Sequence, residues 1–374
     1  VRTSGLTSVS IDAAARRVRV GSGVRWRRIV PALSEMGLAA LHGSSPDVGI
    51  AGYSLGGGMG WLARTHGLQA NSVTAIELVT ADGDLVRADA DHEPDLFWAL
   101  RGGGGNFGVV TAIEFRVHPL PELYAGALFF PFSRAPEVLH AWNAMLPGAP
   151  EELMSWATLF HLPDLPDVPE PFRGASTAVV MAAYQGDEAD GRALLEPLRA
   201  LGPDMDTFAV APPAVLGGLA MEDPADPLPY RSDHALLGAL PPTAIDDLLA
   251  AAGPGSPAGT SLTMLQLRQM GGELARRRPG AGARATLPGD LCLFSLGLVV
   301  DEASGSAVEA SLARVRGALG PHRVGDYPNF VERPADASAF FDPGAWTRLR
   351  EVKALYDPDD LFRGSHHIPP AGTD

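Results

Sequence analysis

The chain nearly lacks cysteine, lysine and long apolar runs. Its 374 residues hold one cysteine, Cys292, and one lysine, Lys353. A single cysteine excludes an internal disulfide framework and a zinc site built from cysteines. No apolar run approaches the roughly 20 residues that cross a membrane. Basic residues are outnumbered by acidic ones, and the net charge of −15 argues against nucleic acid and anionic membranes as partners, because both attract basic patches.

The beginning of the chain also lacks expected features. It opens on Val1 without an initiating methionine. No signal-peptide pattern of basic, apolar and small residues precedes the first strand-like segment. We therefore expect a cytoplasmic protein, and a start that has been misassigned or trimmed rather than a naturally short first domain.

Length and composition predict a globular α+β protein of two domains. Apolar residues make up 46% and charged residues 20% of the chain, which is ordinary for such proteins. Short alternating strands and glycine-rich loops fill residues 1–120. Residues 121–320 hold most of the prolines and mix strands such as "TAVVMAAY" with helices such as "DEADGRALLEPLRALG". We expect these two domains to be followed by a C-terminal segment, 321–374, that contains one amphipathic helix.

Two glycine-rich stretches are the most unusual feature. "DVGIAGYSLGGGMGWL", residues 47–62, holds six glycines in 16 residues, and "GGGGNFG", residues 102–108, holds the second run. Apolar residues between the glycines favour an ordered loop over a flexible linker, which would be polar. Successive bare N–H groups bind phosphate without lysine, so the two loops could hold a diphosphate between them. The alternative is a pair of tight corners packed against each other without a ligand.

A dinucleotide-binding motif is present in form only. Gly103-x-Gly105-x-x-Gly108 matches G-x-G-x-x-G, and Gly58-x-Gly60-x-x-Ala63 matches its variant. That site requires a strand, a tight turn and then a helix beneath the pyrophosphate. The residues after Gly108, "VVTAIEFRV", are β-branched and alternate in polarity, so they predict a strand. This disfavours an NAD-dependent dehydrogenase.

Three motifs together carry a family resemblance: "DLFWALRG", "GGGGNFGVVT" and, near the end, "RLREVKALYDPDDLF…IPP". With them the chain resembles the vanillyl-alcohol oxidase superfamily with its PCMH-type FAD-binding domain, and it is most similar to the bacterial berberine-bridge-enzyme-like oxidoreductases. The likeness is weakest over 121–320. It implies a two-lobed FAD-binding domain over 1–120, incomplete at its N-terminus. It also implies a substrate domain over 121–320 with an antiparallel sheet flanked by helices, and a segment 321–374 that returns to the FAD domain.

The resemblance implies that FAD lies extended between the two glycine loops, where side chains would push it out. Its diphosphate and ribityl part would be lined by Val48, Gly49, Gly52, Gly56, Gly57 and Gly60. Asn71 and Val73 would lie near the adenine end or its linker, and Gly103, Gly108 and Val110 would form the second wall. Asn329 and His366 are further implied cofactor contacts, with a surface histidine as the alternative for His366.

One departure from the family concerns covalent attachment. Many relatives bind FAD through a histidine in an early "GGH" loop and a cysteine in "G-x-C-x-x-V-G". Here the second segment is "GSSPDVG" with Ser45 in the cysteine position, and the given chain has no "GGH". We therefore expect non-covalent FAD.

The expected chemistry is hydride transfer to the flavin with removal of a proton from the substrate. The family often uses a tyrosine in a Y-x-N segment, which here is "DYPNF" and gives Tyr327. Because the ordinary tyrosine pKa is near 10, a base at this position needs nearby positive charge, for which Arg323 and Arg333 are close in sequence. A structural tyrosine is the alternative.

These observations predict an FAD-dependent oxidoreductase. We expect an oxidase that transfers hydride from a C–H of a small secondary metabolite or sugar alcohol to flavin N5, with O2 as acceptor. The alternative is a flavin-free or catalytically silent ligand-binding remnant, which Ser45 and the missing upstream residues would favour. No spacing of metal ligands or of a Ser-His-Asp triad stands out.

Overall fold

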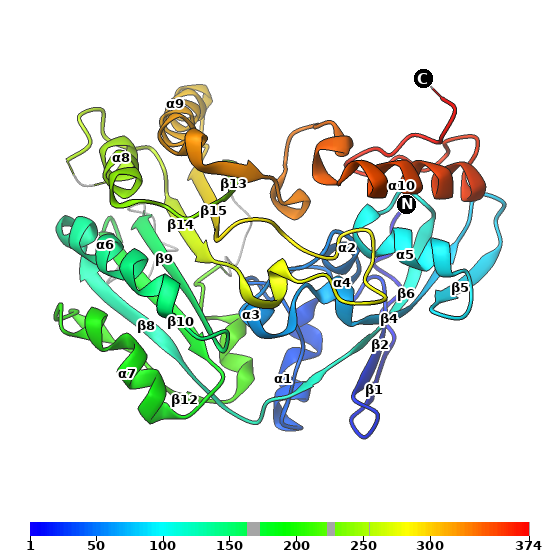
Figure 1. The fold of residues 1–374 in the computed structure, drawn as a ribbon, viewed down its shortest axis with the longest axis horizontal. Helices are drawn as coiled ribbons and strands as arrows, with labels where there is room; N and C mark the ends of the chain where they lie inside the picture. Colours follow the sequence, from blue (N-terminus) through cyan, green and yellow to red (C-terminus); the bar gives the residue numbers. More distant parts are fainter. Residues whose placement is uncertain (163–172, 223–228, 254, 374) are drawn as a thin grey trace.

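The computed structural model describes residues 1–162, 173–222, 229–253 and 255–373. Two antiparallel sheets lie side by side, each with helices packed against it (Figure 1). The smaller sheet takes its strands from the first 116 residues and the larger from residues 123–325. The predicted α+β class is confirmed. No helix in these ranges is long and apolar enough to cross a membrane.

The smaller sheet has five strands in the order β1-β2-β6-β4-β5. Their bounds are β1 Val9–Asp12, β2 Arg17–Gly21, β4 Val73–Val79, β5 Leu85–Asp89 and β6 Val109–Arg116. Alternation sends Val18 and Val20 into the core, while Arg19 on the other face pairs with Glu77 of β4. Strand β6 directly follows Gly108, so the prediction of a strand and not a helix at this point is confirmed.

Short helices cover the buried face of this sheet. They are η1 Trp26–Arg28, α1 Val30–Glu35, α2 Ile50–Leu55, α4 Gln69–Ser72 and α5 Pro94–Gly103, with a two-stranded ribbon of β3 Leu38–Ala39 and β7 His118–Pro119 beside them. Helix α3 Ala63–His66 packs instead against residues 272–275 and 153–161. Helix α10, Pro343–Tyr356, packs on α5 and contributes Leu349 and Val352 to the same core. The C-terminal segment therefore shares its core with the first 120 residues.

The larger sheet has nine strands, in the order β11-β8-β10-β9-β14-β15-β13-β16 with β12 also paired to β8. Their bounds are β8 Leu123–Pro131, β9 Leu153–His161, β10 Ser176–Tyr184, β11 Met205–Asp206, β12 Ala209–Ala211, β13 Tyr230–Leu237, β14 Met264–Gln269, β15 Leu291–Leu298 and β16 Arg323–Gly325. Strand alternation gives this sheet two faces, and both are buried.

The outer face of the larger sheet carries the helices α6 Ala135–Met145, α7 Glu188–Arg199, α8 Pro242–Ala252 and α9 Glu302–Leu319 (Figure 1). Short 3-10 turns connect the remaining segments: η2 Phe132–Arg134, η3 Leu146–Gly148, η5 Pro213–Gly217, η6 Gly272–Ala275, η7 Gly320–His322, η8 Pro328–Phe330 and η9 Ala337–Phe340. The inner face meets the first part of the chain, and there Trp156 of β9 stacks on Trp61 with ring centroids 3.6 Å apart. This aromatic stack joins the two halves next to the cleft described below.

Candidate functional site

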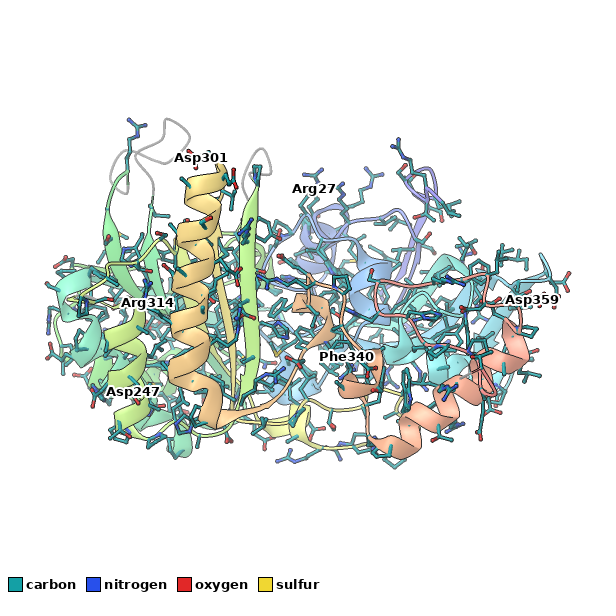
Figure 2. All side chains as sticks on the ribbon, turned by 90° about the horizontal axis from the view of Figure 1, so that it is seen from above. Arg27, Asp247, Asp301, Arg314, Phe340 and Asp359 are labelled. Atoms are coloured by element: carbon teal, nitrogen blue, oxygen red, sulfur yellow. The ribbon has the colours of Figure 1, made fainter. Side chains whose placement is uncertain are left out.

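A cleft of about 510 Å³ opens where the two glycine loops meet the C-terminal segment. Figure 2 shows one of its residues, Phe340, between the half that carries α9 and the half that carries α10. Its lining consists of Gly43, Ser44, Ser45, Val48, Gly52, Tyr53, Leu55, Gly56, Met59, Gly102, Gly103, Gly104, Gly105, Asn106, Arg268, Tyr327, Pro328, Asn329, Phe330, Val331, Phe340, Phe341, Ser365, His366 and Ile368. Four segments far apart in the sequence thus converge on one space.

The structure brings part of the predicted set together in this cleft: Val48, Gly52, Gly56, Gly103, Tyr327, Asn329 and His366. It places the other predicted cofactor residues outside the lining: Gly49, Gly57, Gly60, Asn71, Val73, Gly108 and Val110. Val73 and Val110 are buried core residues of β4 and β6. The side chain of Asn71 donates to Ala285 O at 2.9 Å, so it ties α4 to a distant loop.

Most of the predicted glycines are bare because the protein itself lies against them. A Cβ on Gly56 would lie 1.8 Å from Oδ1 of Asn329, and one on Gly60 would lie 1.8 Å from the carbonyl oxygen of His42. Gly57 has φ of +127° and packs against Arg284 and Tyr327. A side chain on Gly57 would therefore meet protein atoms, and Gly57 is not part of the cleft's lining. Gly104 N donates to Leu55 O at 3.2 Å, so the two loops also bond to each other.

A smaller set of glycines faces the cleft. A Cβ on Gly52 or Gly105 would meet nothing within 4 Å, and one on Gly104 would meet only Nδ2 of Asn106, at 3.9 Å. All three line the cleft, so they present bare backbone to an open space that side chains would narrow. Nδ1 of His366, in the same lining, is buried without a hydrogen-bond partner. Bare backbone and an unpaired ring nitrogen fit a large polar cofactor such as FAD.

Asn106 fixes the second glycine loop to the C-terminal segment. Its Nδ2 donates to Gly103 O at 2.8 Å and to His366 O at 2.9 Å, and its Oδ1 accepts from the backbone N–H groups of Gly364 and Ile368. One buried amide thus holds both walls of the cleft in register. The sequence analysis missed this residue, although an asparagine within a glycine run is a signal for such local bonding.

Tyr327 lies at the floor of the cleft and is 1% exposed. Its hydroxyl oxygen accepts from the backbone N–H of Met59 at 2.9 Å. Burial raises its pKa well above 10, even though this hydrogen bond and Arg268 act in the opposite direction. The two arginines expected to help are engaged elsewhere, Arg323 with Asp326 and Arg333 with Glu309. Tyr327 is therefore a neutral phenol at neutral pH, which does not suit a resting-state base.

Arg268 is the most important residue that the sequence analysis missed. It lies on β14, is 1% exposed and stacks over Trp156 with its guanidinium carbon 4.1 Å from the ring centroid. Its Nη2 donates to Glu222 at 3.1 Å. A signal was available, because Gln266 and Arg268 occupy alternate positions of β14 and so place two polar side chains on one face of a buried strand.

Ser45 lines the cleft, as expected of the position where relatives carry cysteine. The chain's one cysteine, Cys292, is buried on β15 and is not part of the lining, so no cysteinyl bond can form in the cleft. The described residues contain no group of three histidine, cysteine or acidic side chains that could hold a metal ion.

Comparisons with known proteins agree with this geometry. Residues 1–89 match the family model described as an FAD binding domain. The chain is 30% identical to (R)-6-hydroxynicotine oxidase of Paenarthrobacter nicotinovorans, over 98% of this chain and 81% of that protein. It is 26% identical to the xylooligosaccharide oxidase of Thermothelomyces thermophilus, over 99% of this chain and 78% of that protein.

Among solved structures, the fold matches that of the Physcomitrella patens berberine-bridge-enzyme-like 1 protein. The TM-score is 0.82 with 20% identity, over 99% of this chain and 81% of that chain. The motifs, the cleft and these likenesses agree: the chain belongs to the berberine-bridge-enzyme-like FAD-linked oxidoreductases of the vanillyl-alcohol oxidase superfamily, and it is an FAD-dependent oxidoreductase.

Proposed function

We propose that this protein is an oxidase that removes hydride from a C–H bond of a small organic molecule and uses O2 as the electron acceptor. The observation that carries the proposal is the pairing within one cleft of a bare backbone wall, at Gly52, Gly104 and Gly105, with aromatic side chains that include Tyr327. Relatives named as oxidases for a nicotine derivative and for a xylooligosaccharide support the acceptor and the size class of the substrate.

We assign the binding of FAD to the residues that line the cleft: Val48, Gly52, Gly56, Gly103, Gly104, Gly105, Asn329 and His366. Bound FAD supplies an N5 atom that takes hydride and returns the electrons to O2. The other predicted residues, Gly49, Gly57, Gly60, Asn71, Val73, Gly108 and Val110, then shape and support the two walls. At Gly60 and Gly108 the missing side chain lets neighbouring backbone segments pack closely.

In this proposal Tyr327 positions the substrate. Because its oxygen already accepts from Met59, its hydroxyl proton is available to donate. As a neutral phenol it can hold a substrate oxygen or nitrogen at the cleft floor and so fix the C–H that reacts. Burial among Met59, Leu68 and Cys292 keeps water away from this point.

The test begins with the purified protein and its visible absorption. A flavin band, present as isolated or after addition of FAD, is expected to leave with the supernatant on acid precipitation. The flavin should then bleach anaerobically with a substrate from a panel of small aromatic and sugar alcohols, phenols and amines, and oxygen should restore the band with release of hydrogen peroxide. A protein that binds no FAD, or whose reduced flavin reacts only with other acceptors, would contradict the proposal.

A further inference from the structure

The electrostatic character of the cleft depends on one side chain. Arg268 is the sole residue of the larger sheet that reaches the lining, as far as the described residues show. Within the same part of the chain, no aspartate, glutamate or lysine lines the cleft. A protein with a net charge of −15 thus presents a single guanidinium, and no carboxylate, to its binding space. Such a site favours a negatively charged ligand group.

Aromatic rings surround this guanidinium. Its central carbon lies 4.1 Å from the ring centroid of Trp156 and 4.9 Å from that of Phe330. Phe330 in turn packs edge-on against Tyr327, with ring centroids 4.9 Å apart. The cation is therefore fixed in direction by rings and lies close to the phenol at the cleft floor. It is also shielded from water, which strengthens any charge interaction that it makes.

The hydrogen-bonding capacity of Arg268 is only partly used. Its Nε donates to Gln266, and its Nη2 donates to Glu222 at 3.1 Å and to Ser44 Oγ at 3.4 Å. Among the described residues, no hydrogen bond is made by Nη1, whose two N–H groups can donate. These two N–H groups are not fully enclosed by protein, so an acceptor on a ligand in the cleft can reach them. A charged acceptor would make stronger hydrogen bonds there than a neutral one.

Glu222 does not satisfy all the hydrogen-bond donors of Arg268. Its side chain is 20% exposed, so it lies at the edge of the site, and it is not part of the cleft's lining. Ser44 donates to the same carboxylate, which holds Glu222 to one side of the guanidinium. The edge of Arg268 that carries Nη1 is thus left for another partner.

We propose that Arg268 binds an oxyanion carried by an aromatic substrate, a carboxylate or a phenolate, and so sets the substrate class of the oxidase proposed above. The cleft supplies the aromatic surroundings through Tyr53, Tyr327, Phe330, Phe340 and Phe341. A guanidinium beside the phenol of a substrate favours the phenolate. A phenolic substrate held in this way is already deprotonated, which suits a cleft whose described lining offers no carboxylate base, whereas a carboxylate substrate would be held in place by the same contact.

The binding test uses the FAD-loaded protein and ligands that are not oxidised. Benzoate and its neutral isostere benzamide are titrated at constant ionic strength while the tryptophan fluorescence is followed, since Trp156 contacts Arg268 directly. The wild-type protein should bind benzoate at least about tenfold more tightly than benzamide, which is about 1.4 kcal/mol. A parallel titration with 4-nitrophenol reports by its colour whether the phenolate is the bound form, and so separates carboxylate from phenolate recognition.

Substitutions of Arg268 and of Glu222 should change benzoate binding in opposite directions. Arg268→Gln should abolish the preference for benzoate, and Arg268→Lys should keep part of it. Glu222→Gln removes the competing carboxylate and should strengthen benzoate binding severalfold. Arg192→Gln is the matched control, because Arg192 lies exposed on α7 and pairs with Glu188. It should bind as the wild type does.

The outcomes separate this inference from the oxidase proposal. Equal binding of benzoate and benzamide by the wild type, an unchanged preference in Arg268→Gln, or no gain in Glu222→Gln would each overturn the assignment of Arg268. Selective benzoate binding in a protein that oxidises nothing on the panel would support the anion site and reject the oxidase. Turnover of neutral sugar alcohols by a protein that does not bind benzoate would support the oxidase and reject the anion site.

Discussion

Two regions of this protein each bury a cation, and they do so in different ways. Lys353 on α10 is 0% exposed and donates to the carbonyl oxygens of Asn106 and Phe362 and to the carboxylate of Asp357. Asp360 lies 3.2 Å from the same ammonium group. All three ammonium protons therefore have acceptors. Arg268, at 1% exposed, leaves Nη1 without a described partner beside the cleft.

The difference distinguishes a structural charge from one available to a ligand. Lys353 joins the second glycine loop, the end of α10 and the segment after it, so its charge is used entirely within the fold. Burial alone would raise the pKa of Asp357, yet the bonds from Lys353 and from two backbone N–H groups lower it overall. Arg268 sits in a looser arrangement with one carboxylate at the rim. The predictions below test this contrast.

The largest expected effect is on Lys353. Lys353→Met leaves Asp357 buried without its counter-charge and should lower the free energy of unfolding by about 3–5 kcal/mol. Arg268→Gln should cost distinctly less, because Glu222 can turn to water from its partly exposed position. Chemical denaturation of both variants beside the wild type measures the contrast.

The double variant Lys353→Met with Asp357→Asn is the matched control. It removes both charges, and the amide oxygen of the asparagine can still accept from a backbone N–H at this helix end, so it should recover part of the lost stability. If Arg268→Gln proved as destabilising as Lys353→Met, Arg268 would also be a structural charge, and the distinction drawn here would fail.

The sequence predicted the fold well because the fold depends on local patterns. The alternation after Gly108 and the amphipathic helix expected within 321–374 each mark their own element. The site was harder to predict, because its parts come from four segments and their meeting is a tertiary event. Arg268 lies 206 residues after Leu62, where the first glycine loop ends, and nothing local to either shows that they line one cleft.

The glycine predictions illustrate a second limit. Sequence alone shows that a position is bare, but not what lies against it. At Gly56 it is the side chain of Asn329, whereas at Gly52 it is open space. Both patterns look alike in the sequence, so a cofactor contact and a packing contact could not be told apart.

The next effect in size separates these two kinds of glycine. Gly56→Ala should displace Asn329 and lower the stability of the FAD-free protein by about 1–3 kcal/mol, as overpacking does. Gly52→Ala should leave that stability unchanged or slightly higher, because Gly52 lies within α2 and alanine favours a helix. It should weaken FAD binding nonetheless. Thermal unfolding without FAD measures the stability of each variant, and a titration with FAD measures its affinity. If Gly52→Ala bound FAD as tightly as the wild type, Gly52 would not be part of the wall that contacts the cofactor.

A smaller effect is the dependence of stability on pH, which arises because the buried side chain of His118 disfavours a positive charge. His118 stacks on His66 with ring centroids 4.0 Å apart, and burial, together with His66 and Arg116, lowers the pKa of His118 to about 3. Below about pH 6.5 the unfolded state binds the proton that the folded state refuses, so stability falls as the pH falls from 6.5 toward 3. We expect a loss of about 1–2 kcal/mol between pH 7 and pH 5.

Denaturation across this pH range is the measurement, with His118→Phe as the variant that should make the profile less steep. Part of the slope should remain, because burial also lowers the pKa values of His42, His66 and His161. The pair formed by Lys353 and Asp357 should contribute no slope there. Since the pKa of Asp357 is lowered from 3.8, its contribution is lost only as the pH falls below that value. A slope that is unchanged in His118→Phe and disappears in Lys353→Met would reverse the assignment.

The smallest stability effect is expected at Tyr327, which combines a structural bond with an available proton. Tyr327→Phe leaves the N–H of Met59 without its acceptor and should cost about 1 kcal/mol. FAD should remain bound, whereas reduction of the flavin by substrate should slow about 10-fold to 100-fold. Stopped-flow reduction under anaerobic conditions measures this, and an unchanged rate would remove Tyr327 from the site's working residues.

The most direct test of the contrast between the two buried cations is the benzoate-induced shift in the unfolding temperature of the FAD-loaded protein, measured for the wild type and Arg268→Gln. A ligand that binds only the folded state stabilises it by an amount that grows with the logarithm of the ligand concentration relative to its dissociation constant. The account predicts a rise of the unfolding temperature with benzoate in the wild type and none in Arg268→Gln. The same rise in both proteins would show that the cation in the cleft is as fully committed to the fold as Lys353.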